Sequence, residues 1–302
     1  MKVSVVVVTC NQEAFIDAAM RSVLEQRTPF DFEVIVSEDA STDGTRSIVE
    51  DWRARHPDRV RLLLSARNLA SNEVVARGFR AARGEYVALL DGDDYWTSSD
   101  KLRVQSEFLD TNPDLSLCFH NAAVIDDRGD PVRPLYTPPD QKQRSTLDDL
   151  WNGNPFATCT SMFRRSAVSS LPEWFEGFFP ITDWPLYVLF AERGDIGFIP
   201  AVMGAYRVHA GGLYSRRPER EKLASVDRFY RRINDCLSSR YDHRIRAAHR
   251  RYFYDWARAY AARGERALAR ECLALGRRYG SSLTPGSLLE TAKLFLLVYG
   301  PS

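Results

Sequence analysis

The chain of 302 residues has few cysteines, no excess of either charge and no long apolar run. Its five cysteines lack CxxC spacing, which indicates neither a zinc site nor a disulfide framework and favours a reducing, cytoplasmic setting. The 41 basic and 40 acidic residues leave a net charge of +1, which argues against a nucleic-acid-binding protein. A hydrophobic content of 44% is ordinary for a folded protein with a large core.

Signals for export, membrane insertion and dinucleotide binding are also missing. The sequence enters the apolar segment 3–9 almost at once, so we expect no cleavable signal peptide. A helix expected over 287–299 is apolar near its end, but Glu290 and Lys293 make it too short and polar to span a bilayer. No GxGxxG follows segment 3–9, which disfavours a dinucleotide-binding dehydrogenase.

The first hundred residues alternate between strand and helix signals. Segment 3–9 is continuously apolar, as expected of a central strand covered on both faces. We expect Asn11 to cap the first helix and Asp43 the second. The expected strands are 3–9, 32–36, 60–64 and 86–90, and the expected helices are 13–26, a segment containing residues 48–52, and 72–82. This order predicts an α/β fold with a mostly parallel sheet, helices on both faces, and ligands at the carboxyl ends of the strands.

An acidic loop, Asp91–Asp94, follows the last of these strands. Side chains at alternate positions of an extended segment point the same way, so Asp91 and Asp93 can share one cation, while Gly92 allows close approach of the backbone. Carboxylate oxygens suit Mg²⁺ or Mn²⁺, which proteins usually hold together with substrate phosphates. The alternative is a solvated acidic turn without a ligand.

Four stretches carry a family resemblance: VVVVTCNQEAF, VIVSEDASTDGT, RNLASNEVVARGF and GEYVALLDGDDYW. In this order and spacing, residues 1–105 resemble an inverting family 2 glycosyltransferase of the GT-A fold, of the kind that builds bacterial surface polysaccharides. The resemblance implies a GT-A domain over 1–214. Its nucleotide-sugar-binding half is expected at 1–105 and its acceptor-binding half at 106–214, with a C-terminal helical region over 215–302.

The resemblance also implies residues that bind a UDP- or dTDP-activated sugar. Asp39 has a physical reason to be acidic, because a carboxylate accepts the imide N–H of uracil or thymine. A helix cap is the alternative for Asp39, a turn for Asn68 and a solvated helix face for Arg77. The implied nucleotide-sugar-binding residues are Thr9, Asn11, Glu13, Asp39, Asn68, Arg77, Asp91 and Gly92.

The metal and the catalytic base are implied in the same way. Asp93 resembles the carboxylate that bridges Mn²⁺ or Mg²⁺ to the diphosphate, with Asp91 and Asp94 beside it, and His209 matches a residue that approaches the metal in some relatives. Asp183 matches the base that takes the proton of the acceptor hydroxyl. Its alternative role is to cap an amphipathic helix over 185–193. Glu173 and Glu176 are nearby alternatives for the base.

The acceptor is the least defined partner. A strand over 158–163 falls in the region that faces the acceptor in the family, which makes Thr160, Ser161 and Trp184 candidates for binding a glycan or lipid-linked acceptor. Segment 126–145 is rich in Pro, Asp, Gln and Arg and is either an ordered excursion or a flexible loop.

Beyond residue 215 the sequence becomes helical and basic. Residues 216–251 hold 12 Lys and Arg against 5 Asp and Glu, and residues 252–275 resemble one tetratricopeptide-like helical hairpin. Contact with anionic lipid headgroups and a solvated helical face packed on the main domain are both open.

Two other functions compete with the transferase. A haloacid-dehalogenase-like phosphatase also places two carboxylates after an apolar strand, but its motif opens the fold, whereas here three strand–helix units come first. A non-catalytic nucleotide-sugar-binding protein would keep Asp39 and the acidic loop and lack the base. The sequence therefore predicts a metal-dependent inverting glycosyltransferase, with these two alternatives.

Overall fold

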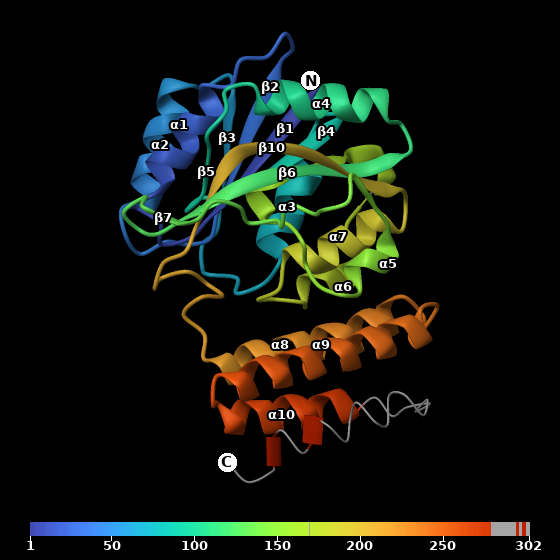
Figure 1. The fold of residues 1–302 in the computed structure, drawn as a ribbon. Helices are drawn as coiled ribbons and strands as arrows, with labels where there is room; N and C mark the ends of the chain where they lie inside the picture. The colour runs from blue at the N-terminus through green and yellow to red at the C-terminus, as the bar shows by residue number, and fades with distance from the viewer. Residues whose placement is uncertain (169, 279–293, 296–297, 300–302) are drawn as a thin grey trace. The chain divides into compact units, whose positions relative to one another are not determined.

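The computed structural model describes residues 1–168, 170–278, 294–295 and 298–299 (Figure 1). The chain forms two compact units, the first made of Met1–Leu147 and Pro155–Ser215, the second of Asp148–Asn154 and Arg216–Ser302. Most of the helix expected over 287–299 lies outside the described residues.

The amino-terminal half builds the parallel part of the central sheet. Strands β1 (Val3–Thr9), β2 (Phe32–Glu38), β3 (Val60–Leu64) and β4 (Tyr86–Asp91) pair in parallel in the order β3-β2-β1-β4. Helices α1 (Ile16–Leu24), α2 (Thr45–Arg55) and α3 (Glu73–Ala81) connect them, as predicted. The register sets Thr9 opposite Glu38 and Val8 opposite Asp91, so the carboxyl ends of β1, β2 and β4 lie at one edge of the sheet.

The following segments extend this sheet with mixed pairing. Strand β9 (Ser161–Arg164) is antiparallel to both β4 and β6 (Leu115–Ile125), while β10 (Asp195–Arg207) is parallel to β6 and antiparallel to β5 (Tyr95–Trp96). The predicted parallel pairing therefore holds among β1 to β4 and between β6 and β10, whereas β5 and β9 pair antiparallel. The remaining elements of this part are α4 (Lys101–Thr111), β7 (Pro131–Arg133), β8 (Arg144–Ser145), α5 (Leu147–Leu150), α6 (Glu173–Glu176) and α7 (Asp183–Ala191). Segment 126–145 is thus an excursion that returns to the sheet through β7 and β8.

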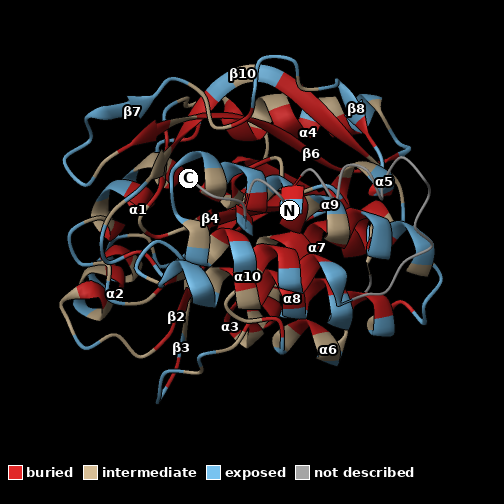
Figure 2. Ribbon diagram, turned by 60° about the horizontal axis from the view of Figure 1, so that its bottom comes forward, coloured by how far each residue is buried: buried red, intermediate tan, exposed pale blue. Residues whose placement is uncertain are grey.

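The core explains why β1 is an almost continuous apolar run and why even the polar residues of β2, which are Glu33, Ser37 and Glu38, are covered. All seven residues of β2, and six of seven in β1, are buried, because helices flank the sheet (Figure 2). Helix α7 is buried at every position from Trp184 to Ala191, so the prediction of an amphipathic helix over 185–193 is wrong. A helix covered all round has no polar face.

Two further local predictions are wrong. Asn11 does not cap the first helix, which begins at Ile16 after Phe15. Instead, Asn11 has a φ of +54°, and its Oδ1 accepts a hydrogen bond from the Thr42 N–H. The expected strand over 158–163 begins as a 3₁₀ turn, Thr158–Thr160, before β9. At Asn11 a contact distant in sequence overrides the local signal, while the 3₁₀ turn is closed by the local bond from the Thr160 N–H to the Ala157 carbonyl.

The second unit is helical. Its long helices in the described residues are α8 (Glu219–Cys236), α9 (Asp242–Ala262) and α10 (Arg266–Arg277), and Gly264, with a φ of +78°, makes the turn between α9 and α10. A buried Asp227 on α8 accepts a hydrogen bond from His249 on α9 at 2.9 Å. No helix in the described residues is long and apolar enough to cross a membrane.

Candidate functional site

The acidic loop lies against the end of β1. The Gly92 N–H donates to the Val8 carbonyl at 2.8 Å, and the Asp94 N–H donates to the Asp91 carbonyl at 3.0 Å, which closes a tight turn. A Cβ at Gly92 would lie 2.6 Å from Gln12 Oε1 and 2.8 Å from Thr9 Oγ1. Glycine is therefore required for the loop to pack on the neighbouring strand end.

The loop brings three carboxylates close together, with Asp94 buried and Asp91 and Asp93 half-buried. Burial, and then the charges of Asp93 and Asp183, raise the pKa of Asp91 to about 8. Burial, and then Asp93, also raise the pKa of Asp94 well above its ordinary value, and Asp94 Oδ2 has no hydrogen bond in the described residues. Buried acids of this kind need a counter-charge, and hard carboxylate oxygens fit Mg²⁺ or Mn²⁺.

His209 lies next to this loop, which is the position that the resemblance implies for it. Its Nε2 is 3.0 Å from Asp93 Oδ2, and its ring meets the edge of Phe15 at 4.8 Å between centroids. In the part of the chain that the structure describes, no three His, Cys, Asp or Glu side chains are arranged to hold a metal ion. The candidate metal residues therefore meet as the close pair Asp93 and His209, with Asp91 within electrostatic reach of Asp93.

Arg207 on β10 supports the loop from the other side. Its Nε donates to the Asp93 carbonyl at 2.9 Å, and its N–H donates to Asp94 Oδ1 at 2.8 Å. The guanidinium also lies 4.6 Å from the centre of the Phe15 ring. Arg207 stands in the stretch that the resemblance singled out for His209, but its support of the acidic loop could not be predicted because Asp93 and Asp94 lie more than a hundred positions away.

Asp183 is the first residue of α7. Its Oδ1 accepts a hydrogen bond from the Trp184 N–H at 2.8 Å, and its charge contributes to the raised pKa of Asp91. Asn72 holds the preceding segment by donating to the Ile181 carbonyl at 3.0 Å and accepting from Thr182 Oγ1 at 2.8 Å. The geometry thus places Asp183 near the acidic loop and at the start of a helix.

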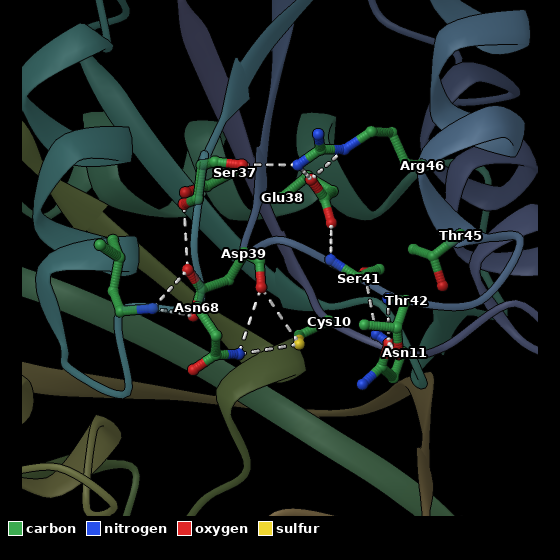
Figure 3. A network of polar contacts seen from close by, with 12 residues as sticks. Cys10, Asn11, Ser37, Glu38, Asp39, Ser41, Thr42, Thr45, Arg46 and Asn68 are labelled. Atoms are coloured by element: carbon green, nitrogen blue, oxygen red, sulfur yellow. Dashed lines mark hydrogen bonds and ion pairs between the residues drawn. The ribbon is translucent and has the colours of Figure 1, made fainter.

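The carboxylate of Asp39 is held by the loop after β3 (Figure 3). Asp39 Oδ1 accepts hydrogen bonds from Ser65 Oγ and the Leu69 N–H, both at 3.0 Å. Asn68 Nδ2 donates to the Asp39 carbonyl at 3.2 Å. The helix after β2 is not capped by Asp39, because the Thr45 N–H donates to Asp43.

The other donor-binding candidates link neighbouring loops. The Glu13 N–H donates to Asp43 Oδ2 at 3.1 Å, and the Gly44 N–H donates back to Glu13 Oε2 at 2.6 Å. Arg77 Nε donates to Ser37 Oγ at 2.8 Å. Thr9 is buried at the end of β1, and its hydroxyl has no hydrogen-bond partner in the described residues.

The acceptor candidates are buried. Thr160 Oγ1 donates to the Ala157 carbonyl and Ser161 Oγ to the Thr158 carbonyl, both at 2.7 Å. The Trp184 side chain is also buried. Both hydroxyl donors are therefore used within the protein.

Comparisons with known proteins agree with this architecture. A model of the family "Glycosyl transferase family 2" matches residues 4–171. An uncharacterised protein of Mycobacterium tuberculosis is 37% identical over 213 residues, which cover 70% of this chain and 60% of the relative, so the chain spans about 60% of that relative's length. A putative teichuronic acid biosynthesis glycosyltransferase of Bacillus subtilis, TuaG, is 28% identical over 56% of this chain and 64% of its own.

Solved structures share the fold at low sequence identity. TarS 1-349 of S. aureus, in complex with UDP-GlcNAc, has a TM-score of 0.61 and 20% identity over 78% of this chain and 67% of that one. The mannosyltransferase PcManGT of Pyrobaculum calidifontis, in complex with GDP-Man and Mn²⁺, has a TM-score of 0.61 and 20% identity over 98% of this chain and 80% of that one. The chain is therefore a member of glycosyl transferase family 2, with the GT-A fold.

Proposed function

We propose that the protein is a metal-dependent inverting glycosyltransferase that moves a sugar from a UDP- or dTDP-activated donor to a hydroxyl of a glycan or lipid-linked acceptor. The observation that carries the proposal is the acidic loop, in which burial and the charge of Asp93 raise the pKa of both Asp91 and Asp94, and the charge of Asp183 raises that of Asp91 further. Family membership removes the haloacid-dehalogenase-like phosphatase from consideration. A non-catalytic nucleotide-sugar-binding protein remains the alternative.

In this mechanism the protein binds and orients the donor and the acceptor, and it accepts a proton from the acceptor. Asp93 and Asp91 would hold Mn²⁺ or Mg²⁺, which would supply Lewis-acid stabilisation to the departing diphosphate. Arg207 fixes the loop that carries both acids. Asp183 takes the proton of the acceptor hydroxyl as that oxygen attacks the anomeric carbon from the face opposite the diphosphate, which inverts the configuration.

The donor class rests on the loops at the ends of β1 and β2. We propose that the nucleoside is surrounded by Thr9, Asn11, Glu13, Asp39, Asn68 and Arg77. Asp39 would accept a hydrogen bond from the nucleobase through an oxygen that also accepts one from the protein, since each carboxylate oxygen has two lone pairs. The complexes of TarS with UDP-GlcNAc and of PcManGT with GDP-Man and Mn²⁺ support nucleotide-sugar and metal use. The name of TuaG supports a role in surface polysaccharide synthesis.

Calorimetric titration of UDP, dTDP and GDP with and without Mn²⁺ tests this proposal. We expect Mn²⁺-dependent binding of one nucleotide, lost in Asp93→Ala because the metal site loses a carboxylate. Glu107→Ala is the matched control, since Glu107 is an exposed acid on α4 whose side chain pairs with Arg103. Absence of binding by all three nucleotides would contradict the proposal.

We also propose that the enzyme works in the cytoplasm, at the inner face of the membrane, where its C-terminal helices contact anionic lipid. Residues 216–278 hold 18 Lys and Arg against 8 Asp and Glu, and basic segments of this kind are attracted to anionic lipid surfaces. Flotation with vesicles that contain phosphatidylglycerol should carry the protein upward at low salt. Flotation that is equally poor with neutral and anionic vesicles would exclude this location.

A further inference from the structure

Asn72 stands immediately before α3, at the position where a side chain usually caps a helix. Asparagine is favoured there because its side-chain oxygen accepts a hydrogen bond from an N–H of the first turn. The Asn72 side chain makes no such bond, although it is fully buried. Its amide bonds instead to residues 175–182, which we call the base segment because it ends next to Asp183. The helix start thus gives up a local contact for one that lies more than a hundred residues away.

The Asn72 amide holds both ends of the base segment. Its Nδ2 donates to the Phe175 carbonyl at 3.2 Å and to the Ile181 carbonyl at 3.0 Å. Its Oδ1 accepts a hydrogen bond from Thr182 Oγ1 at 2.8 Å. Both amide hydrogens are therefore used, and the last of the three partners is the residue directly before Asp183.

Helix α3 is fixed against the strands that carry the donor-binding candidates. A Cβ at Gly78 would lie 2.4 Å from Val6 Cγ1, so the helix packs directly on β1. Arg77 Nη2 donates at 3.0 Å to the carbonyl of Glu38, the last residue of β2. Asn72 therefore connects a helix that is fixed to the donor side of the sheet with the segment that leads to the proposed base.

Further contacts from α3 reach the start of the base segment. Ser71 Oγ and the Asn72 N–H both donate to the Glu176 carbonyl, at 3.1 and 3.2 Å. The Arg80–Glu176 ion pair is longer, at 3.8 Å, and its side chains are partly exposed, so it contributes little. At the end of the segment, beside Asp183, the hydrogen bonds come from the Asn72 amide. Because hydrogen bonds have narrow limits of distance and angle, these bonds set the position of the residues before Asp183.

We propose that Asn72 and Thr182 are positioning residues, which fix Asp183 relative to the strand ends that bind the donor. This inference rests on the proposed transferase function and on Asp183 as its base. The base has to meet the acceptor hydroxyl on the face opposite the diphosphate, and a displacement of about 1 Å can lower a rate about a hundredfold. Asparagine suits the role because an aspartate at position 72 would offer no hydrogen to the two carbonyl groups.

The test uses the full chain with Thr182→Val, which removes the hydroxyl and keeps the shape, and Thr182→Ser, which keeps the hydroxyl. Thr182 is partly exposed, so both variants should fold, whereas substitution of the buried Asn72 would disturb the core. Nucleotide release from UDP-glucose, UDP-GlcNAc and dTDP-glucose is measured with Mn²⁺ and with water as the acceptor. We expect Thr182→Val to lower kcat about tenfold, because the Asn72 oxygen loses its partner, and Thr182→Ser to keep the wild-type kcat. Nucleotide affinity, measured by calorimetric titration, should be unchanged in both variants.

Combining Thr182→Val with Asp183→Asn separates a positioning role from a merely structural one. If Thr182 acts through Asp183, the Thr182→Val substitution should lower kcat no further once Asp183 is replaced. Single-turnover release, with the enzyme in excess of the donor, measures these slow rates. The inference is overturned if Thr182→Val keeps the wild-type kcat, or if it lowers kcat by the same factor in both backgrounds.

Thr28→Val is the matched control, because the Thr28 hydroxyl donates to the Phe30 carbonyl at 2.6 Å in the loop before β2, at the amino end of the sheet. It should lower the melting temperature and leave kcat unchanged. An equal loss of kcat in Thr28→Val would overturn the inference, since the loss would then follow stability. A wild-type kcat in Asp183→Asn would remove the base on which the inference rests. If no nucleotide binds, or if the wild-type protein releases none from any donor, the proposed function itself fails, and this inference fails with it.

Discussion

Buried acids occupy both ends of the central sheet, and their surroundings differ. At the amino end, Glu33 on β2 accepts hydrogen bonds from Ser4 Oγ at 2.7 Å, from Arg83 and from Arg61. Burial alone would raise the pKa of Glu33, but the hydrogen bonds from Ser4 and Arg83 outweigh it and lower the pKa. This acid has counter-charges supplied by the fold.

At the carboxyl end, Asp91 and Asp94 are surrounded by other acids. Their pKa values are raised by burial and then by Asp93, and the guanidinium of Arg207 donates to the Asp93 carbonyl instead of to a carboxylate. Burial is shared by both ends, so burial does not separate a structural acid from a ligand-binding one. The presence or absence of a counter-charge from the protein separates the two kinds of acid.

The largest effect expected from this difference is on turnover. Asp183→Asn should lower turnover about thousandfold while nucleotide binding stays unchanged, because the amide cannot accept the acceptor proton. Glycosyl transfer and calorimetric titration measure the two properties separately. Glu173→Gln, which alters a nearby alternative base, should retain activity. The reverse pattern would place the base at Glu173, and a wild-type protein with no turnover would favour the non-catalytic alternative.

Substitution of the buried acid at the amino end of the sheet should lower stability and leave catalysis unchanged. Glu33→Gln should lower the free energy of unfolding by about 2 kcal/mol, because charge-assisted hydrogen bonds from the partly exposed Arg61 and Arg83 are weakened. Urea unfolding and a turnover assay on the same sample check this. A Glu33→Gln variant with normal stability and reduced turnover would contradict a purely structural role for Glu33.

A smaller effect is expected where a repelling charge is removed. Asp94→Asn should raise the free energy of unfolding of the metal-free protein by about 1 kcal/mol, since the amide keeps an acceptor for the Arg207 N–H and loses repulsion from Asp93. Thermal unfolding without metal checks the gain. Asp114→Asn, which removes an acid paired with Arg144, should give no gain.

The two ends should also respond to pH with opposite signs. Asp91 keeps its proton in the folded state up to about pH 8 and loses it near pH 4 when unfolded, so its contribution to stability falls as pH rises between these values. Glu33 has a lowered folded pKa, so its contribution is present above pH 4.5 and is lost as pH falls below that. Melting temperatures measured from pH 3 to 9 test both, and Asp91→Asn should flatten the upper window only. Added Mn²⁺ should also reverse the upper slope.

Local pattern predicts the parallel half of the sheet well. Strands β1 and β3 have the predicted bounds, and β2 and β4 are one or two residues longer. In this half β1 and β2, and β2 and β3, each pair within one crossover, while β4 pairs with β1; the apolar pattern and the turn residues mark where each of the four strands begins and ends. The antiparallel insertion of β9 between β4 and β6 depends on pairing across 70 residues of chain and has no local signal.

The candidate site was predictable to the same extent. Asp91–Asp94, Asp183 and His209 stand in recognisable stretches, and the structure brings them close together. The contact between the Tyr136 and Tyr206 rings was not predictable, because the two residues are far apart in sequence and meet only through the fold. The Asn11 cap failed for the same reason, since its partner Thr42 lies in another loop.

The reciprocal bonds between Glu13 and the turn Asp43–Gly44 have a consequence for engineering. Each of the two loops at the ends of β1 and β2 completes the hydrogen bonding of the other, so their lengths and sequences are linked. Grafting only one of them from a homologue would leave two backbone donors without acceptors. A chimaera meant to accept a different nucleotide therefore has to exchange residues 9–15 and 38–45 as one cassette.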